Sequence, residues 1–94
     1  MEEIKRFAEE KNLKVHIDGT RVFNTIIEQK LCPKRLGTVC DTMTISIRRG
    51  LSCPIGSLIL GTADEIKRAR KERKRYGASL GKVGMMAGSG IYAL

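Results

Sequence analysis

The chain has 94 residues, of which 41% are apolar and 30% charged, so it is long enough for one small folded domain and too apolar for a disordered segment. Its formal net charge of +8 would suit an anionic partner, but the excess is concentrated between Lys67 and Arg75. Cys32, Cys40 and Cys53 are odd in number and lack a Cys-x-x-Cys spacing, which argues against a disulfide framework and a zinc site.

The cysteines and the two ends of the chain indicate a cellular compartment. Free thiols in such an arrangement are typical of a reducing, cytoplasmic environment. The acidic start, Met1-Glu-Glu, carries no secretory or transit signature, and the longest apolar stretch, residues 83–94, is too short to span a bilayer. We therefore expect a soluble cytoplasmic protein with no membrane partner.

The first part of the chain predicts a helix, a strand and a second helix. Apolar residues recur at helical spacing among charged ones over residues 1–12, which predicts an amphipathic helix. Residues 14–17 alternate polar with β-branched side chains and predict a short strand, which ends at Asp18 and the glycine after it. A second helical spacing covers residues 21–30, and Pro33 stops that helix.

The second part predicts two strands and two helices. Residues 43–47 and 57–60 are short apolar runs bounded by turn residues, so both predict strands. Thr62-Ala-Asp-Glu has the spacing of a capping box and predicts the start of a helix over residues 63–75, with Gly77 as its stop. Acidic residues at the start of this helix and basic ones at its end agree with the helix dipole. A glycine-rich helical tail follows.

This order of elements indicates an α/β fold. The lengths of the crossovers predict a parallel sheet with helices on its faces. A sheet of three strands leaves long edges open to pairing with other chains, so the chain looks like part of a larger fold.

Asp18 stands where a strand is expected to end and a helix to begin. In open α/β sheets, the carboxyl end of a strand is where ligand-binding groups are found. Taken alone, the residue could equally be a helix-capping aspartate in an Asp-Gly turn. Arg21 follows on the first turn of the helix and could hold an anion near Asp18. An isolated Asp-Gly-x-Arg string, however, mostly marks a turn with a solvated arginine.

His16 is the only histidine of the chain and lies two residues before Asp18, on the same face of the predicted strand. No metal cluster built around histidines and no Ser-His-Asp arrangement can form with a single histidine. We therefore expect a satisfied, partly buried strand histidine and no metal site.

Two stretches resemble one known family. Residues 46–57, Ser-Ile-Arg-Arg-Gly-Leu-Ser-Cys-Pro-Ile-Gly-Ser, and residues 16–21, His-Ile-Asp-Gly-Thr-Arg, are similar to the cofactor-holding segment of the low-specificity L-threonine aldolases. The similarity continues without gaps to Leu94. It implies that residues 1–94 are part of the large domain of the pyridoxal-phosphate-dependent, aspartate-aminotransferase-like fold, with a mostly parallel sheet flanked by helices. The N-terminal part and the C-terminal small domain of that fold are then absent.

The resemblance also implies roles for single residues. Asp18 would hold the protonated pyridine nitrogen of pyridoxal 5′-phosphate, as does the aspartate of the family's His-x-Asp-Gly-Ala-Arg motif. Arg21 would help to hold anionic groups in the cofactor site. Gly81 stands where the family has an arginine that contacts the substrate carboxylate, so this contact is expected to be lost. Lys82 beside it is cationic but should point elsewhere.

Arg49 decides whether the family's chemistry is retained. The family has Ser-Lys-Gly-Leu at this place, and the resemblance makes its lysine the residue that forms the Schiff base with the cofactor aldehyde. A lysine can lose its proton and attack an aldehyde, whereas a guanidinium stays protonated and delocalised. Shifting the match by one residue does not help, because Arg48 is also an arginine.

Three functions follow from these observations. The first is a threonine-aldolase-like carbon–carbon lyase by descent, whose intact relatives are oligomeric and cleave threonine or allo-threonine to glycine and acetaldehyde; this chain would be an inactive pseudoenzyme. The second is a non-catalytic fold remnant that forms a homo-oligomer or pairs with a full-length homologue. The third is a basic nucleic-acid-binding module carried by residues 67–75, which capping and charge order make the least favoured.

Overall fold

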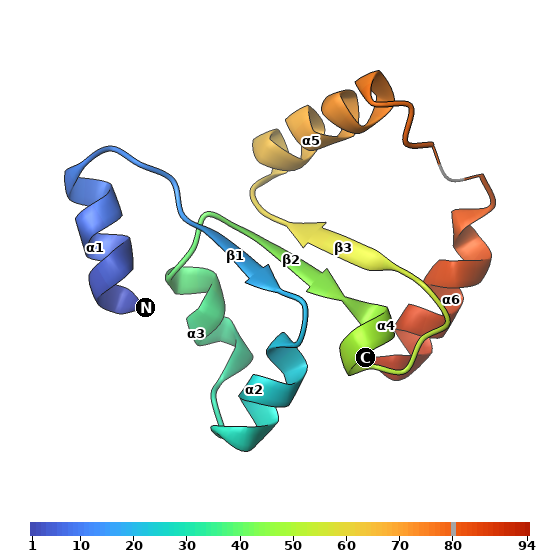
Figure 1. Cartoon of the computed structure of the whole chain (residues 1–94), viewed down its shortest axis with the longest axis horizontal. Helices are drawn as coiled ribbons and strands as arrows, with labels where there is room; N and C mark the ends of the chain where they lie inside the picture. The colour runs from blue at the N-terminus through green and yellow to red at the C-terminus, as the bar shows by residue number, and fades with distance from the viewer. Residues whose placement is uncertain (80) are drawn as a thin grey trace.

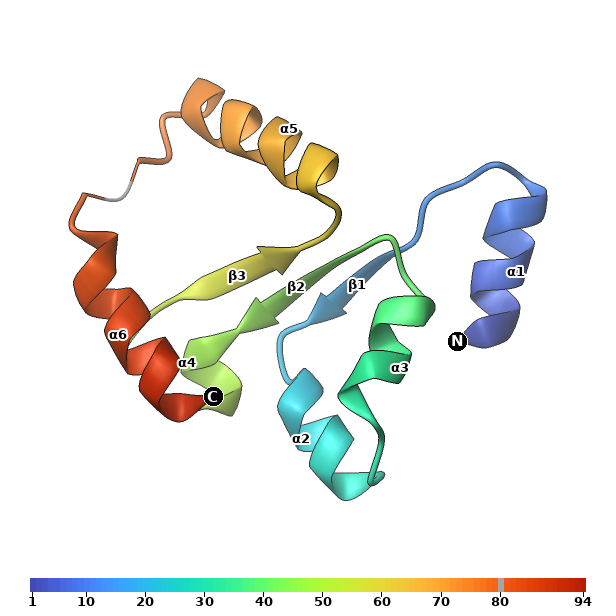
Figure 2. The same cartoon turned by 180° about the vertical axis from the view of Figure 1, so that it is seen from behind.

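The computed structural model describes residues 1–79 and 81–94 and consists of a small three-stranded sheet with helices on either side of it (Figure 1). In chain order the elements are α1 (Glu2–Glu10), β1 (His16–Gly19), α2 (Val22–Glu28), α3 (Pro33–Thr38), β2 (Thr42–Ser46), α4 (Ile47–Gly50), β3 (Ser57–Leu60), α5 (Ala63–Arg75) and α6 (Val83–Ala93). The molecule is flat, with extents of 42 × 35 × 17 Å. Helices α1, α2 and α3 lie on the β1 side of the sheet, and α5 and α6 lie on the β3 side (Figures 1 and 2).

The sheet has the order β1-β2-β3 and is mixed. Strand β1 pairs with β2 in parallel, with His16 opposite Thr42 and Asp18 opposite Thr44. Strand β3 pairs with β2 in antiparallel orientation, with Ser46 opposite Ser57. The predicted α/β class is therefore confirmed, but the predicted parallel pairing holds only for β1 and β2. A parallel crossover needs about a dozen or more residues, and residues 47–56 between β2 and β3 are too few.

The predicted elements are largely confirmed, and two short helices were not predicted. Strand β3 and helix α5 have the predicted bounds, while α1, β1 and α2 differ from their predictions by a few residues at their ends. Pro33 does not only stop a helix: it begins α3, where its fixed φ and missing N–H are tolerated in the first turn. Helix α4 has four residues, too few for a periodic pattern, so its first residue, Ile47, was placed in the preceding strand.

The core is small and lies around the middle strand. Met43, Ile45 and Ile47 are buried, together with Val39 of the α3–β2 connection and Cys53. No described side chain is completely enclosed, as expected for a chain of this length. Strand β3, by contrast, is exposed along its whole length, and so is most of α6. The apolar surface of the sheet therefore extends beyond what this chain covers.

Two glycines allow close approaches that hold the carboxyl ends of β1 and β2 in place. A Cβ on Gly19 would lie 2.8 Å from the carbonyl oxygen of Thr44, so only glycine lets β1 turn away this close to β2. Gly56 has φ +133°, and a Cβ there would lie 2.7 Å from Cδ1 of Ile47. Its carbonyl oxygen accepts a hydrogen bond from the Ile47 N–H at 3.2 Å, which fixes the start of α4.

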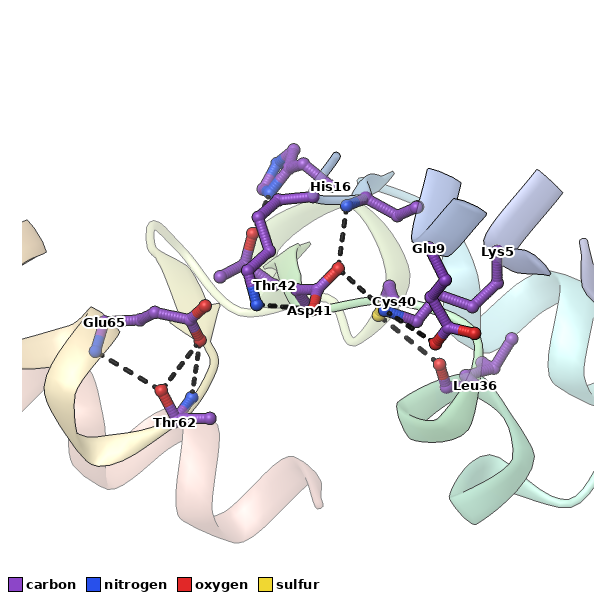
Figure 3. Close-up of polar contacts among 11 residues, drawn as sticks. Lys5, Glu9, His16, Leu36, Cys40, Asp41, Thr42, Thr62 and Glu65 are labelled. Carbon is purple, nitrogen blue, oxygen red and sulfur yellow. Dashed lines mark hydrogen bonds and ion pairs between the residues drawn. The ribbon is translucent and has the colours of Figure 1, made fainter. Parts of the chain in front are cut away.

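The amino end of the sheet is tied together by Asp41, just before β2 (Figure 3). Its carboxylate accepts hydrogen bonds from the Val15 N–H at 2.8 Å, from Lys5 Nζ at 2.9 Å and from Lys14 Nζ at 3.1 Å. Only 13% of the Asp41 side chain is exposed. These bonds hold its pKa well below the usual range, the Val15 N–H contributing most. Asp41 thus connects α1, the segment before β1, and β2.

The capping box predicted at the start of α5 is confirmed. The Thr62 hydroxyl accepts the Glu65 N–H at 3.4 Å, and the Glu65 carboxylate accepts the Thr62 N–H at 2.9 Å (Figure 3). The helix ends at Arg75, and Gly77 beyond it has the positive φ of a helix stop, +68°. Among the helices of the described residues, none has both the length and the apolar character needed to cross a membrane.

Candidate functional site

The candidate site begins with Asp18, the third residue of β1. Its side chain lies at the carboxyl end of the parallel pair β1 and β2, and it is exposed. Its Oδ1 atom accepts two hydrogen bonds from Thr20, one from the backbone N–H at 3.0 Å and one from the hydroxyl at 2.6 Å. The turn after β1 therefore holds one carboxylate oxygen. In the described part of the chain, Oδ2 accepts no hydrogen bond from another residue.

The pKa of Asp18 is lowered from its ordinary value, so this group is an anion at neutral pH. The main causes are the two hydrogen bonds from Thr20, the hydroxyl first and then the backbone N–H. The charges of His16 and Arg49 lower it further. The structure thus brings Arg49, distant in sequence, into the electrostatic surroundings of Asp18.

His16 lies on the same face of β1 as Asp18 and bridges to the neighbouring strand. Its Nδ1 is 2.8 Å from Thr42 Oγ1, and its Nε2 is 3.2 Å from Thr44 Oγ1. Both ring nitrogens thus have hydroxyl partners, which confirms the prediction that this histidine is satisfied. The predicted partial burial is wrong: His16 is exposed, because no described element covers this face of β1.

Arg49 lies on α4, immediately after β2. The Ser46 side chain caps this short helix by accepting the Arg49 N–H at 3.3 Å. Ser46 is buried, whereas Arg48 and Arg49 are both exposed. Because parallel strands end at the same edge of a sheet, the turn after β2 brings Arg49 to the side on which β1 ends at Asp18. Ser46 thus determines where the cation is presented.

The other two predicted site residues lie next to helices α2 and α6. Arg21 is the N-cap residue of α2, with φ −125°, and its side chain is exposed. Gly81 lies just before α6, and a Cβ at this position would meet no atom within 4 Å. The Cβ of a larger residue would therefore meet no clash with the described atoms at position 81, and the following residue, Lys82, has left-handed backbone angles.

Two contributors to the site were not predicted. Ser46 was treated as part of a motif, and only the structure shows its hydroxyl capping α4. Thr20 stands where the family motif has alanine. This difference is the one feature of the sequence that could have indicated a role for its hydroxyl. Its effect depends on the turn geometry that brings its hydroxyl to Asp18.

The arrangement suits a planar cationic donor better than a metal ion. Groups of three or more potential metal-binding side chains are absent from residues 1–79 and 81–94. A carboxylate with one available oxygen can accept a charge-assisted hydrogen bond from a protonated ring nitrogen, as in the pyridine ring of pyridoxal 5′-phosphate. Arg49, the cation that acts on this carboxylate, is a guanidinium and has no amine that can become neutral.

Comparison with known proteins decides the family. The sequence profile of the beta-eliminating lyase family matches residues 1–94, the whole chain. The chain belongs to the beta-eliminating lyase family. This confirms the resemblance inferred from residues 16–21 and 46–57. Enzymes of this family depend on pyridoxal phosphate.

Individual relatives agree with this family assignment. It is 40% identical over 94 residues to the low specificity L-threonine aldolase of Escherichia coli K12, covering 100% of this chain and 28% of that protein. It is 33% identical over 84 residues to the Saccharomyces cerevisiae enzyme of the same name, covering 89% of this chain and 22% of that protein. The chain thus spans about a quarter of the length of these relatives.

Solved structures show the same fold. A protein from Exiguobacterium sp. 255-15, assigned to the aromatic amino acid beta-eliminating lyases/threonine aldolases, matches with a TM-score of 0.85 and 26% identity, over 97% of this chain and 26% of that one. A Listeria monocytogenes protein assigned as an L-allo-threonine aldolase matches with a TM-score of 0.84 and 20% identity, over 97% and 26% of the two chains. The chain therefore has the backbone of one part of that fold.

Proposed function

We propose that the chain descends from a threonine-aldolase-type carbon–carbon lyase and does not itself cleave threonine or allo-threonine to glycine and acetaldehyde. The carrying observation is Arg49, which stands at the lysine position of the resembling motif and acts electrostatically on Asp18. The identity to L-threonine aldolases along the whole chain supports the lineage. In this proposal residues 1–94 correspond to part of the large domain of the pyridoxal-phosphate enzyme.

In this proposal the site retains the polar contact with the cofactor ring and has lost the covalent one. The Oδ2 atom of Asp18 would accept a hydrogen bond from the protonated ring nitrogen, while Oδ1 accepts those from Thr20. Arg21 would lie beside the site as a further cation for anionic groups. Pyridoxal phosphate supplies an electron-withdrawing ring when bound, and a carboxylate at its nitrogen maintains that property. Gly81 would leave the substrate carboxylate without its arginine.

The guanidinium of Arg49 could pair with a phosphate but could not form a carbon–nitrogen bond with an aldehyde. Its nitrogens share one delocalised charge and stay protonated in proteins, whereas a lysine amine can be deprotonated by its surroundings. Loss of this one group removes the covalent step whatever else the site retains. The proposed loss of the covalent step therefore depends on the residue at position 49.

Reduction trapping tests the proposal. The purified chain is mixed with pyridoxal phosphate and reduced with borohydride, and the modified residue is located by peptide mass mapping. We expect no adduct at position 49 in the parent and a near-stoichiometric adduct there in Arg49→Lys. Arg48→Lys is the matched control, because it makes the same exchange one residue away on the same helix, about 100° around its axis. One stoichiometric adduct at any single lysine of the parent would contradict the proposal.

Exposed apolar surface favours a second candidate function, pairing with a full-length homologue. Leu58, Ile59 and Leu60 of the edge strand β3 are 42%, 48% and 47% exposed. On α6, Met85, Ile91 and Tyr92 are exposed by 77% or more. Apolar edge strands are rarely left open in stable monomers, and about three quarters of the length of the relatives lies outside the part that this chain covers. A related chain could cover this surface.

Co-elution on a sizing column with a full-length low-specificity threonine aldolase tests the pairing. We expect a complex with the parent and its loss in Ile59→Lys, which places a charge on the open edge. Ile27→Lys is the control, because Ile27 lies on α2 and is 77% exposed. A parent chain that elutes as a monomer beside the unchanged homologue would rule this function out.

A further inference from the structure

Thr20 makes the shortest hydrogen bond in the candidate site. Its hydroxyl donates to Asp18 Oδ1 at 2.6 Å, and its backbone N–H donates to the same oxygen at 3.0 Å. A backbone N–H is present whatever residue occupies position 20, but the hydroxyl is specific to threonine and serine. The threonine therefore adds a second donor to a carboxylate that an alanine at this position would leave with one.

The two bonds restrict the Asp18 carboxylate in two ways. They converge on a single oxygen, so rotation of the carboxyl group would break both of them at once. They also stabilise the charged form, because an ionised carboxylate is the better acceptor. The consequence is a side chain held in one orientation, with Oδ2 left as the oxygen for an incoming donor. The second constraint on this region is Gly19, whose close packing on Thr44 fixes the backbone between the two partners.

We propose that Thr20 is a positioning residue for Asp18, whose hydroxyl fixes the carboxylate so that only Oδ2 is offered to a cationic N–H donor. This rests on the proposed function, in which that donor is the protonated nitrogen of the cofactor ring. The geometry makes the site selective for one donor in one direction and unsuited to a ligand that grips both carboxylate oxygens, such as a guanidinium in bidentate contact. Thr20 thus fixes the orientation of the Asp18 carboxylate and favours ligands that donate a single N–H to it.

The test measures Asp18 itself and needs no enzyme activity. The carboxyl carbon resonance of Asp18 is followed by NMR against pH in the parent, Thr20→Val and Thr20→Ser. Valine keeps the branched shape and the backbone N–H but removes the hydroxyl, and serine keeps the hydroxyl. We expect the pKa of Asp18 to rise in Thr20→Val and to return toward the parent value in Thr20→Ser. Thr20→Ala serves in the same way if valine disturbs the fold, as judged from the amide spectrum.

The outcomes separate this inference from the proposed function. An unchanged Asp18 pKa in both Thr20→Val and Thr20→Ala, with folded spectra, would overturn the role of Thr20. A raised pKa in Thr20→Val that serine does not restore would overturn it too, because shape and not the hydroxyl would then be responsible. Pyridoxine 5′-phosphate, which has no aldehyde, is added separately to the parent. Failure of this probe to shift the Asp18 resonance would count against cofactor binding in the proposed function. It would not affect the role of Thr20, which is judged from the Asp18 pKa in the variants.

Discussion

Two aspartates mark the two ends of the parallel strand pair, and their surroundings differ. Asp41, at the amino end, accepts hydrogen bonds from one backbone N–H and two lysines, and its side chain is 13% exposed. Asp18, at the carboxyl end, is exposed and engages one oxygen through Thr20. Every acceptor contact of Asp41 joins segments of the fold, whereas Asp18 joins nothing beyond its own turn. A carboxylate that stabilises the structure and one available to a ligand are thus distinguishable by their partners.

The comparison predicts a large effect on stability from one aspartate and a small one from the other. Asp41→Ala leaves the Val15 N–H without its acceptor and separates Lys5 of α1 from the sheet. We expect the thermal midpoint to fall by several degrees, measured by circular dichroism. Asp18→Ala is the matched control and should change the midpoint much less. Equal losses in the two variants would show that the distinction drawn here is wrong.

Acid should reveal the same difference. The pKa of Asp41 is lower in the folded chain than its ordinary value, so its ionised form stabilises the fold above about pH 4. That stabilisation is lost progressively as the pH falls below this point, because the unfolded chain then binds the proton first. Urea unfolding is measured between pH 6 and pH 2. The free energy of unfolding of the parent should fall as the pH is lowered, and this fall should be smaller in Asp41→Asn. An equally steep acid loss in Asp41→Asn would mean that other carboxyl groups govern it.

The carboxyl end of the pair depends on close packing more than on charge. Gly19→Ala would place a Cβ 2.8 Å from a backbone oxygen of β2, and overpacking of this kind costs about 1–3 kcal/mol. Gly84→Ala is the opposite control, since position 84 is on α6 with open space around it and alanine favours a helix by about 0.5–1 kcal/mol. In denaturant titrations, the free energy of unfolding should fall in Gly19→Ala and rise in Gly84→Ala. Stabilisation by Gly19→Ala would contradict the close approach.

The smallest expected effect concerns the helix next to the Asp41 end. Glu65 of the capping box has a lowered pKa, mainly because of its bonds from Thr62, with Lys14 contributing as it does at Asp41. Thr62→Ala should destabilise the start of α5 by about 1 kcal/mol, visible as faster amide exchange in its first turn. Thr62→Ser keeps the cap and should behave as the parent. Equal exchange in both variants would show that the cap is not important here.

Much of the fold could be predicted because its signals are local. Helix α5 was predicted within its exact bounds, since the capping box, charge order and terminal glycine all depend on neighbours in sequence. Helices α3 and α4 were missed, because six and four residues are too short for a periodic pattern and each begins next to a stronger signal. The antiparallel direction of β3 differs from the predicted parallel pairing, because the connection over residues 47–56 is too short for a parallel crossover.

The sequence alone determined the lineage of the protein and the chemical group at each motif position. An arginine at position 49 cannot supply a neutral amine in any fold. Only the tertiary structure decided which of these residues meet. It placed Arg49 and His16 in the electrostatic surroundings of Asp18, and the Thr20 hydroxyl on Oδ1. The physical reason is that charge and hydrogen bonding depend on distance, and distances between segments are set by strand pairing and close packing rather than by sequence spacing.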